Sequence, residues 1–123
     1  PEGFELPDWV IEEAKENALK SGGSFKITHD VDEAFKGADI VIPKNWGSWS
    51  GKNPDVKITD FKDWKCTEER MATANENVYY MHALPADRGN EVEDSVIDGP
   101  HSIVYQEAEN RIHTAKAVMA LTL

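Results

Sequence analysis

Three clusters of polar and aromatic residues follow apolar runs that predict buried strands. The first, "PKNWGSWS", follows residues 39–42, the second, "HALP", follows residues 78–81, and the third, "QEAENR", follows residues 102–105. Together they offer a histidine, a proline-locked turn, a lysine and an arginine. Such groups can orient a polar substrate and stabilise developing negative charge without a covalent nucleophile. Because ligands of open parallel sheets bind beyond the carboxyl ends of the strands, these clusters form the candidate site.

Each cluster also has a purely structural interpretation. His82 could make a single backbone hydrogen bond at a strand end, and Pro85 could end strand pairing and fix the φ angle of a turn. Trp46 and Trp49 could pack against the core, and Arg111 could belong to a solvated first helical turn. The convergence of the clusters on one edge of the predicted sheet favours a site over this interpretation.

The sequence contains none of several familiar catalytic patterns. Its histidines lack the spacing of a metal site, and it has neither a glycine-rich phosphate loop nor a G-x-S-x-G elbow. A single cysteine, Cys66, excludes an internal disulfide and a cysteine-rich metal centre, and we expect its thiol to be inert and half-buried. We therefore expect neither a metal nor a cofactor.

The length and composition of the chain limit the number of its domains and the partners that it is expected to bind. A chain of 123 residues suits one domain with one core, and 23 acidic against 13 basic residues give a formal net charge of −10. So acidic a chain is not expected to bind nucleic acid or an anionic membrane, which require clustered Lys and Arg. No apolar run approaches the roughly 18 residues of a membrane span, and the first residues lack the basic and apolar regions of a signal peptide. The expected location is cytoplasmic.

The first part of the chain predicts alternating helices and strands. A helix is expected over residues 6–23, capped by Asp8 and closed by Gly22 and Gly23. Its apolar face has helical spacing and consists of Val10, Ile11, Ala14 and Ala18. A strand over residues 24–30, a short helix over 30–36 and a buried strand over 39–42 follow.

The second part of the chain begins with a long loop over residues 44–63, of the kind that is often functional. The elements after it are a helix over 65–77 capped by Thr67, a strand over 78–82, a helix over 91–98, a short strand from Ser102 and a long final helix. The final helix carries an apolar stripe made of Ala108, Ile112, Ala115 and Met119.

Regular alternation of helices and strands predicts an α/β fold. We expect an open, mostly parallel, Rossmann-like sheet of about four strands with helices on both faces. The three clusters would then meet at one edge of the sheet. Such a sheet normally begins with a strand, whereas this chain opens with a helix. We therefore expect the chain to be a piece of a longer protein.

The segments "MHALPADRGNEVEDSVIDGPHSIVYQEAENRIHTAKAVMALTL" and "VDEAFKGADIVIPKNWGSWSG" resemble the aspartate/ornithine carbamoyltransferase superfamily. H-x-L-P together with E-A-E-N-R at this distance is the most specific part of a resemblance that covers essentially the whole chain. It implies that residues 1–123 are the second, amino-acid-binding domain, without the carbamoyl-phosphate domain and without the opening strand of its own domain. The implied reaction transfers a carbamoyl group from carbamoyl phosphate to the amine of ornithine, an acyl-ornithine or a related compound. Members of the family are typically trimers.

The resemblance also implies roles for individual residues. The backbone carbonyls of Ala83 and Leu84, in the turn that contains His82 and Pro85, would receive the amide of carbamoyl phosphate. Arg111 would approach the same substrate. The segment that would hold the amino acid contains Lys44, Asn45, Trp46, Ser48 and Trp49.

The sequence departs from the ornithine enzymes at several of these positions. In their D-x-W-x-S-M-G loop the aspartate is replaced by Lys44, the methionine by Trp49 and the glycine by Ser50, and Ala83 replaces the cysteine of H-C-L-P. A cation in place of an acid favours a carboxylate-bearing acceptor over free ornithine. "K-N-W" is also more similar to the knotted branch, which includes acyl-ornithine transcarbamylases and members of unassigned substrate.

Two other functions fit the same residues. The chain could be a non-catalytic α/β ligand-binding or regulatory domain derived from this family, with Lys44 and Ala83 as marks of a decayed site. It could also be a nucleotide-binding domain, although the missing glycine loop disfavours that function.

Overall fold

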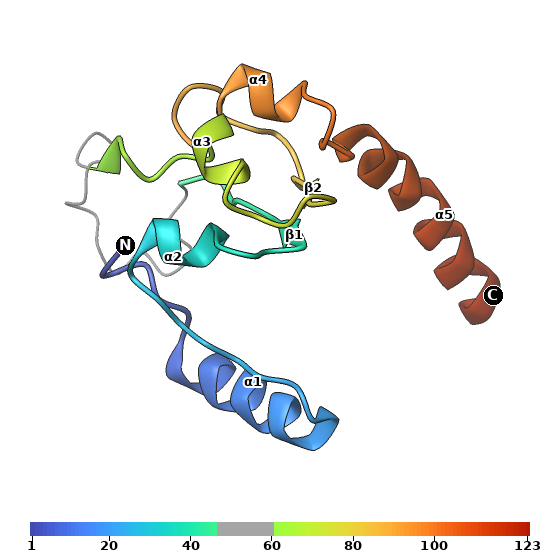
Figure 1. Ribbon diagram of the computed structural model, residues 1–123. Coiled ribbons are helices and arrows are strands. Elements are labelled where there is room, and N and C mark those ends of the chain that lie inside the picture. The colour runs from blue at the N-terminus through green and yellow to red at the C-terminus, as the bar shows by residue number, and fades with distance from the viewer. Residues whose placement is uncertain (47–60) are drawn as a thin grey trace.

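The computed structural model of the protein describes residues 1–46 and 61–123 (Figure 1). Ser48, Trp49 and Ser50 lie outside these residues. In chain order, the elements are α1 (Asp8–Ser21), α2 (Val31–Phe35), β1 (Ile40–Val41), α3 (Glu68–Met71), β2 (Tyr79–Tyr80), α4 (Asp94–Ile97) and α5 (Val104–Thr122).

The sheet is parallel, as the alternation of elements predicts. β1 pairs with β2 in the register Ile40 to Tyr79 and Val41 to Tyr80. On the other side of β2, Ser102 forms a single parallel bridge with Tyr80. The chain segments that follow β1, β2 and Ser102 therefore leave the sheet at the same edge.

The expectation of about four strands is not confirmed, because the described residues form a sheet of two. Residues 24–30, predicted as a strand, have no strand structure. A strand needs a partner for its backbone groups, and Phe25 and Ile27 are instead exposed at 36% and 43%. The strand predicted from Ser102 is limited to its bridge, since α5 begins at Val104.

One face of the small sheet packs on the core and the other is open. Tyr80 is fully buried, whereas the register partners Ile40 and Tyr79 are 54% and 52% exposed. The expected helices on both faces are therefore not found in the described chain. Val41 of β1 packs against the core from a half-buried position. The core itself is built from α2, α3, β2, α4, the start of α5 and the segments that join them: Phe35, Cys66, Met71, Val78, Tyr80, Val92, Val96, Ile97 and Val104.

Of the two predicted helix caps, Thr67 is confirmed, because its hydroxyl accepts a hydrogen bond from the backbone N–H of Arg70. Asp30, which was not predicted as a cap, accepts hydrogen bonds from the backbone N–H groups of Asp32 and Glu33. The predicted cap Asp8 is wrong, because Pro7 occupies the N-cap and Asp8 is the first helical residue. An aspartate there still interacts favourably with the positive end of the helix dipole.

The two long helices contribute little to the core, since α1 has no buried residue and α5 has one, Val104. In Figure 1, α1 and α5 extend from the body as separate arms. The predicted face of α1 is the half-buried one, comprising Val10, Ile11, Ala14 and Ala18. The predicted stripe on α5 is exposed throughout, with Ile112 at 56% and Met119 at 57%.

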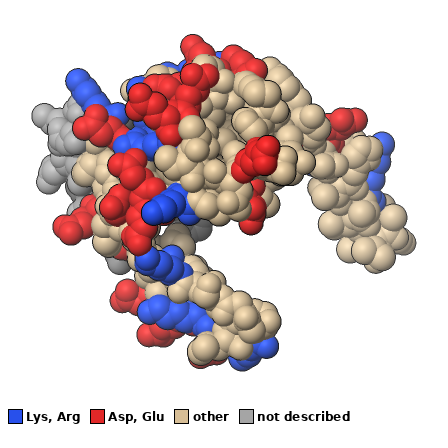
Figure 2. Space-filling model, in the orientation of Figure 1, with Lys and Arg blue, Asp and Glu red and all other residues tan. Residues whose placement is uncertain are grey.

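Charge is unevenly spread over the visible surface. Figure 2 shows acidic and basic side chains intermingled over the region of α1, α2 and α3, whereas the area between that region and α5 carries few charges. On the face shown, the basic side chains of the described residues form no continuous patch. None of the described helices is long and apolar enough to span a bilayer.

Candidate functional site

The turn after β2 combines a buried histidine with an exposed backbone. His82 is only 4% exposed, whereas Ala83, Leu84 and Pro85 are all exposed. Leu84 has a φ of 54°, in the left-handed region that non-glycine residues seldom occupy, and the Leu84–Pro85 peptide is cis. A turn whose backbone is accessible from outside therefore lies at the carboxyl end of the strand.

Three contacts hold His82 in place. Its backbone N–H donates to Oε2 of Glu107 over 2.9 Å, and its Nδ1 accepts from the backbone N–H of Leu84 over 2.8 Å. Its Nε2 lies 2.7 Å from Oε1 of Glu91, although this contact lacks the alignment of a full hydrogen bond. The imidazole is thus part of the frame of the turn.

Glu91 is buried with the histidine that it contacts. Its side chain is 2% exposed, and Oε1 also accepts from the backbone N–H of Asp87 over 2.8 Å. The segment that carries Glu91 is attached to α4, because the Arg88 guanidinium binds the carboxylates of Asp94 at 2.7 Å and Asp98 at 2.6 Å. Sequence reasoning missed Glu91, since a glutamate in a polar turn is ordinarily solvated.

The first turn of α5 belongs to the same site. Glu107, which the sequence allowed to be a solvated acid, reaches back to the His82 backbone. Arg111 is exposed and lies one helical turn beyond Glu107, on the same side of the helix. The structure therefore brings the "HALP" and "EAENR" motifs together, and the hydrogen bond from His82 N–H to Glu107 joins them.

The segment after β1 leaves the sheet at the same edge as the turn after β2. Lys44 and Asn45 are exposed, and no hydrogen bond or ion pair joins Lys44 to another described residue. Trp46 is half-buried, and its Nε1–H donates to the carbonyl of Asn90 over 3.4 Å. Asn90 precedes Glu91, so Trp46 contacts the same segment that supports His82.

Trp46 is also the centre of an aromatic cluster. Its ring stacks on Phe61, with 5.8 Å between centroids, and meets Phe4 edge-on at 5.5 Å. Such contacts add packing energy beyond buried area. Trp46 therefore packs against other residues, as its structural interpretation expects. Its indole also lies beside the candidate site, through its contact with Asn90.

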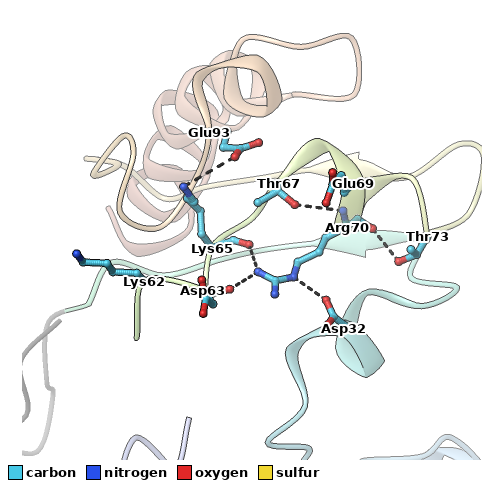
Figure 3. A pocket seen from close by; sticks show the side chains of 9 residues that line it. All are labelled: Asp32, Lys62, Asp63, Lys65, Thr67, Glu69, Arg70, Thr73 and Glu93. Carbon is cyan, nitrogen blue, oxygen red and sulfur yellow. Dashed lines mark hydrogen bonds and ion pairs between the residues drawn. The ribbon is translucent and has the colours of Figure 1, made fainter. Parts of the chain in front are cut away.

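A polar cavity of about 530 Å³ lies elsewhere and contains none of the predicted site residues. Figure 3 shows Arg70 at its centre, with Nε on Asp32 at 2.7 Å and Nη1 on the carbonyls of Lys65, at 2.7 Å, and Asp63 (Figure 3). Through these contacts Arg70 joins α2, α3 and the segment before α3.

Cys66 is not a nucleophile at neutral pH. Burial raises the pKa of its thiol from 9.0 to about 12, and its side chain is 2% exposed. Burial likewise raises the pKa of the neighbouring core residue Tyr80. The expectation of an inert thiol is consistent with this environment, although the thiol is fully rather than half buried.

Comparison with known proteins identifies the family. The family described as aspartate/ornithine carbamoyltransferase, Asp/Orn binding domain, matches residues 1–122. The chain belongs to this family. Curated members similar to it include the ornithine carbamoyltransferases of Pyrococcus abyssi, 42% identical, and Rhodococcus jostii, 37% identical. Each alignment covers 100% of this chain and 39% of the relative, so the chain spans about two fifths of their length.

Solved carbamoyltransferases share the fold. Ornithine carbamoyltransferase from Pyrococcus furiosus superimposes with a TM-score of 0.89 at 41% identity, over 98% of this chain and 39% of that one. A variant of N-acetyl-L-ornithine transcarbamylase in complex with carbamyl phosphate and N-succinyl-L-norvaline gives 0.89 at 35% identity, over 100% and 38%. The α/β class of the chain is thereby confirmed.

Proposed function

We propose that residues 1–123 are the amino-acid-binding domain of a carbamoyltransferase. The complete protein would transfer a carbamoyl group from carbamoyl phosphate to the amine of ornithine, an acyl-ornithine or a related amino acid. Membership of the family supports this function, and so does the coverage of only 39% of curated ornithine carbamoyltransferases. The remainder of the protein would supply the domain that grips the phosphate.

The observation that carries the proposal is the exposed turn fixed to the first turn of α5. Ala83 and Leu84 are exposed, and Glu107 holds the preceding residue, His82, by its backbone N–H. In the proposed reaction the neutral amine attacks the carbonyl carbon, a new N–C bond forms, the C–O bond to phosphate breaks and the amine loses a proton. Turn carbonyls would orient the carbamoyl NH2, and Arg111 would stabilise charge on the oxygens.

The segment after β1 would bind the acceptor. We assign this role to Asn45, Trp46, Ser48 and Trp49, together with Leu84 and Pro85 on the facing turn. Lys44 sets the preferred charge. It is exposed at the sheet edge and makes no ion pair with a described residue, so its ammonium can pair with a carboxylate of the acceptor. An acceptor that offers Lys44 a carboxylate beyond the α-carboxylate of ornithine would be preferred to free ornithine.

Three further properties belong to the same proposal. The complete protein is a cytoplasmic homo-oligomer, with a trimer as the expected form. The chain of residues 1–123 by itself has no transferase activity, because its half of the site contains no phosphate-gripping loop. Its function in the complete protein needs no metal and no cofactor.

The test is an assay of the complete protein with carbamoyl phosphate and a panel of amines. The panel contains ornithine, N-acyl-ornithines and amines without a carboxylate, and the carbamoylated product and released phosphate are both measured. Product from at least one amino acid supports the proposal. Absence of product from every amine would show that the chain serves a binding or regulatory function. Residues 1–123 alone and a no-protein sample are the controls.

A further inference from the structure

The protonation pattern of His82 follows from its contacts. A neutral imidazole has one N–H donor and one acceptor nitrogen. Nδ1 faces the backbone N–H of Leu84 at 2.8 Å, so it must accept and carries no proton. The proton therefore resides on Nε2, the nitrogen that lies 2.7 Å from Oε1 of Glu91. The carboxyl oxygen is close enough to favour a proton on Nε2 electrostatically, although the contact is not aligned as a hydrogen bond.

The Nδ1 contact matters because of the backbone that it holds. Leu84 occupies the left-handed region with a φ of 54°. For a residue other than glycine this conformation is unfavourable and persists only where surrounding contacts enforce it. The hydrogen bond from Leu84 N–H to His82 Nδ1 is such a contact. The orientation of the Ala83 and Leu84 peptide groups therefore depends on the tautomer of His82.

The carboxyl group of Glu91 contacts two described residues, both through Oε1: the backbone N–H of Asp87 at 2.8 Å and Nε2 of His82 at 2.7 Å. Glu91 is 2% exposed, next to the fully buried apolar residue Val92, and its Oε2 is buried without a hydrogen-bond partner among the described residues. Burying a carboxyl oxygen without a partner costs free energy. An apolar residue would avoid that cost, although the backbone N–H of Asp87 would lose its acceptor. Besides holding Asp87, the carboxyl group is placed to orient His82.

We infer that Glu91 is a positioning residue that acts through His82. Its carboxyl group keeps the imidazole proton on Nε2, so that Nδ1 remains free to accept from Leu84 and hold the turn open to the substrate. Neither residue needs to touch the substrate, which is consistent with their burial. The inference rests on the proposed function for its catalytic consequence, but its structural content is independent of that function.

The experiment compares Glu91→Gln with Glu91→Leu in the complete protein. Glutamine retains an oxygen at the Oε1 position and leucine does not. Selective ¹⁵N labelling of histidine, with His82→Asn used to assign the signal, reports which ring nitrogen carries the proton. Steady-state kinetics give kcat/KM for carbamoyl phosphate and KM for the amine. Ile97→Ala, a core change on α4, is the control for general destabilisation.

The expected result separates the two variants. Wild type and Glu91→Gln carry the His82 proton on Nε2, and their kcat/KM values agree within about threefold. In Glu91→Leu the His82 proton is no longer confined to Nε2. Its kcat/KM for carbamoyl phosphate falls by about tenfold to a hundredfold, with the larger loss expected if the turn moves by about 1 Å. The KM for the amine changes less.

Three results would overturn the inference. They are a wild-type proton on Nδ1, a Glu91→Leu variant that keeps both tautomer and kinetics, and an equal kinetic loss in Ile97→Ala. If the wild-type protein carbamoylates no amine, the proposed function fails instead. The tautomer measurement then decides the role of Glu91 by itself.

Discussion

The Oε2 atom of Glu107 accepts a hydrogen bond of 2.9 Å from the backbone N–H of His82. This bond joins residues that are 25 positions apart in the chain, one at the end of β2 and one in the first turn of α5. It orients the turn by its backbone rather than by its side chain. The two motifs that carry the family resemblance are thus parts of one structural unit.

We predict that Glu107→Leu impairs carbamoyl-phosphate use in the complete protein. The variant leaves the His82 N–H without its acceptor, and kcat/KM for carbamoyl phosphate should fall about tenfold or more. Glu107→Gln retains an oxygen acceptor, so its kcat/KM for carbamoyl phosphate should fall far less. Glu12→Leu, at an exposed position on α1, is the matched control. Equal kinetics in all three variants would show that the bond does not position the turn.

Lys44 should decide the charge of the acceptor. In the complete protein, Lys44→Asp should lower kcat/KM for amines that carry a carboxylate beyond the α-carboxylate of ornithine, relative to kcat/KM for ornithine, by about tenfold or more, because it reverses the local charge. Lys36→Asp makes the same change at an exposed position beside α2 and should leave the ratio unaltered. If wild type already prefers ornithine, or if Lys44→Asp leaves its preference untouched, Lys44 is a surface lysine.

Alkaline pH should weaken the fold. Burial raises the pKa of Cys66 from 9.0 to about 12, so the unfolded chain releases this proton at a lower pH than the folded chain. The stabilisation is complete below about pH 9 and is lost as pH rises toward 12, by at most about 1.4 kcal/mol per pH unit. Tyr80 acts in the same direction.

Chemical unfolding between about pH 7 and about pH 11 measures this effect. Cys66→Ala should have a lower free energy of unfolding at neutral pH, because it leaves a small cavity, but a flatter dependence on alkaline pH. An unchanged slope in Cys66→Ala would assign the alkaline loss to other groups. The native thiol should also react slowly with iodoacetamide until the protein is unfolded.

Gly99 should not tolerate a side chain. A Cβ at this position would overlap the backbone carbonyl of Ser95 and approach that of Val96 at 3.2 Å. Gly99→Ala should therefore lower the free energy of unfolding by about 2 kcal/mol, since backbone atoms of α4 would have to move. Gly23→Ala, whose Cβ meets its nearest atom at 3.4 Å, should be close to neutral. Similar unfolding curves for the two variants would contradict this account.

The sequence correctly predicted features of the fold that depend on neighbouring residues alone. The parallel pairing of β1 with β2 and the cap at Thr67 follow from short-range patterns, and both predictions are confirmed. Residues 24–30 were misassigned because a strand exists only with a partner, and an apolar alternation does not say whether the chain provides one.

Long-range side-chain partners were beyond the reach of sequence patterns. Glu91 and Arg70 look like ordinary surface charges in the sequence, yet the first is buried against His82 and the second binds three segments. Such roles depend on which segments the fold brings together. Glu107 shows the same limit, since its helical position was predicted and its partner was not.

The stack of Trp46 on Phe61 has a consequence for sequence variation. The two rings, 5.8 Å apart, fix both ends of the span from residue 47 to residue 60. The entropic cost of bringing two anchors together grows slowly with the number of residues between them, by about 0.6 kcal/mol for each doubling. A change in the number of residues between Trp46 and Phe61 should therefore cost little free energy of folding, as long as the stack between the two rings is kept.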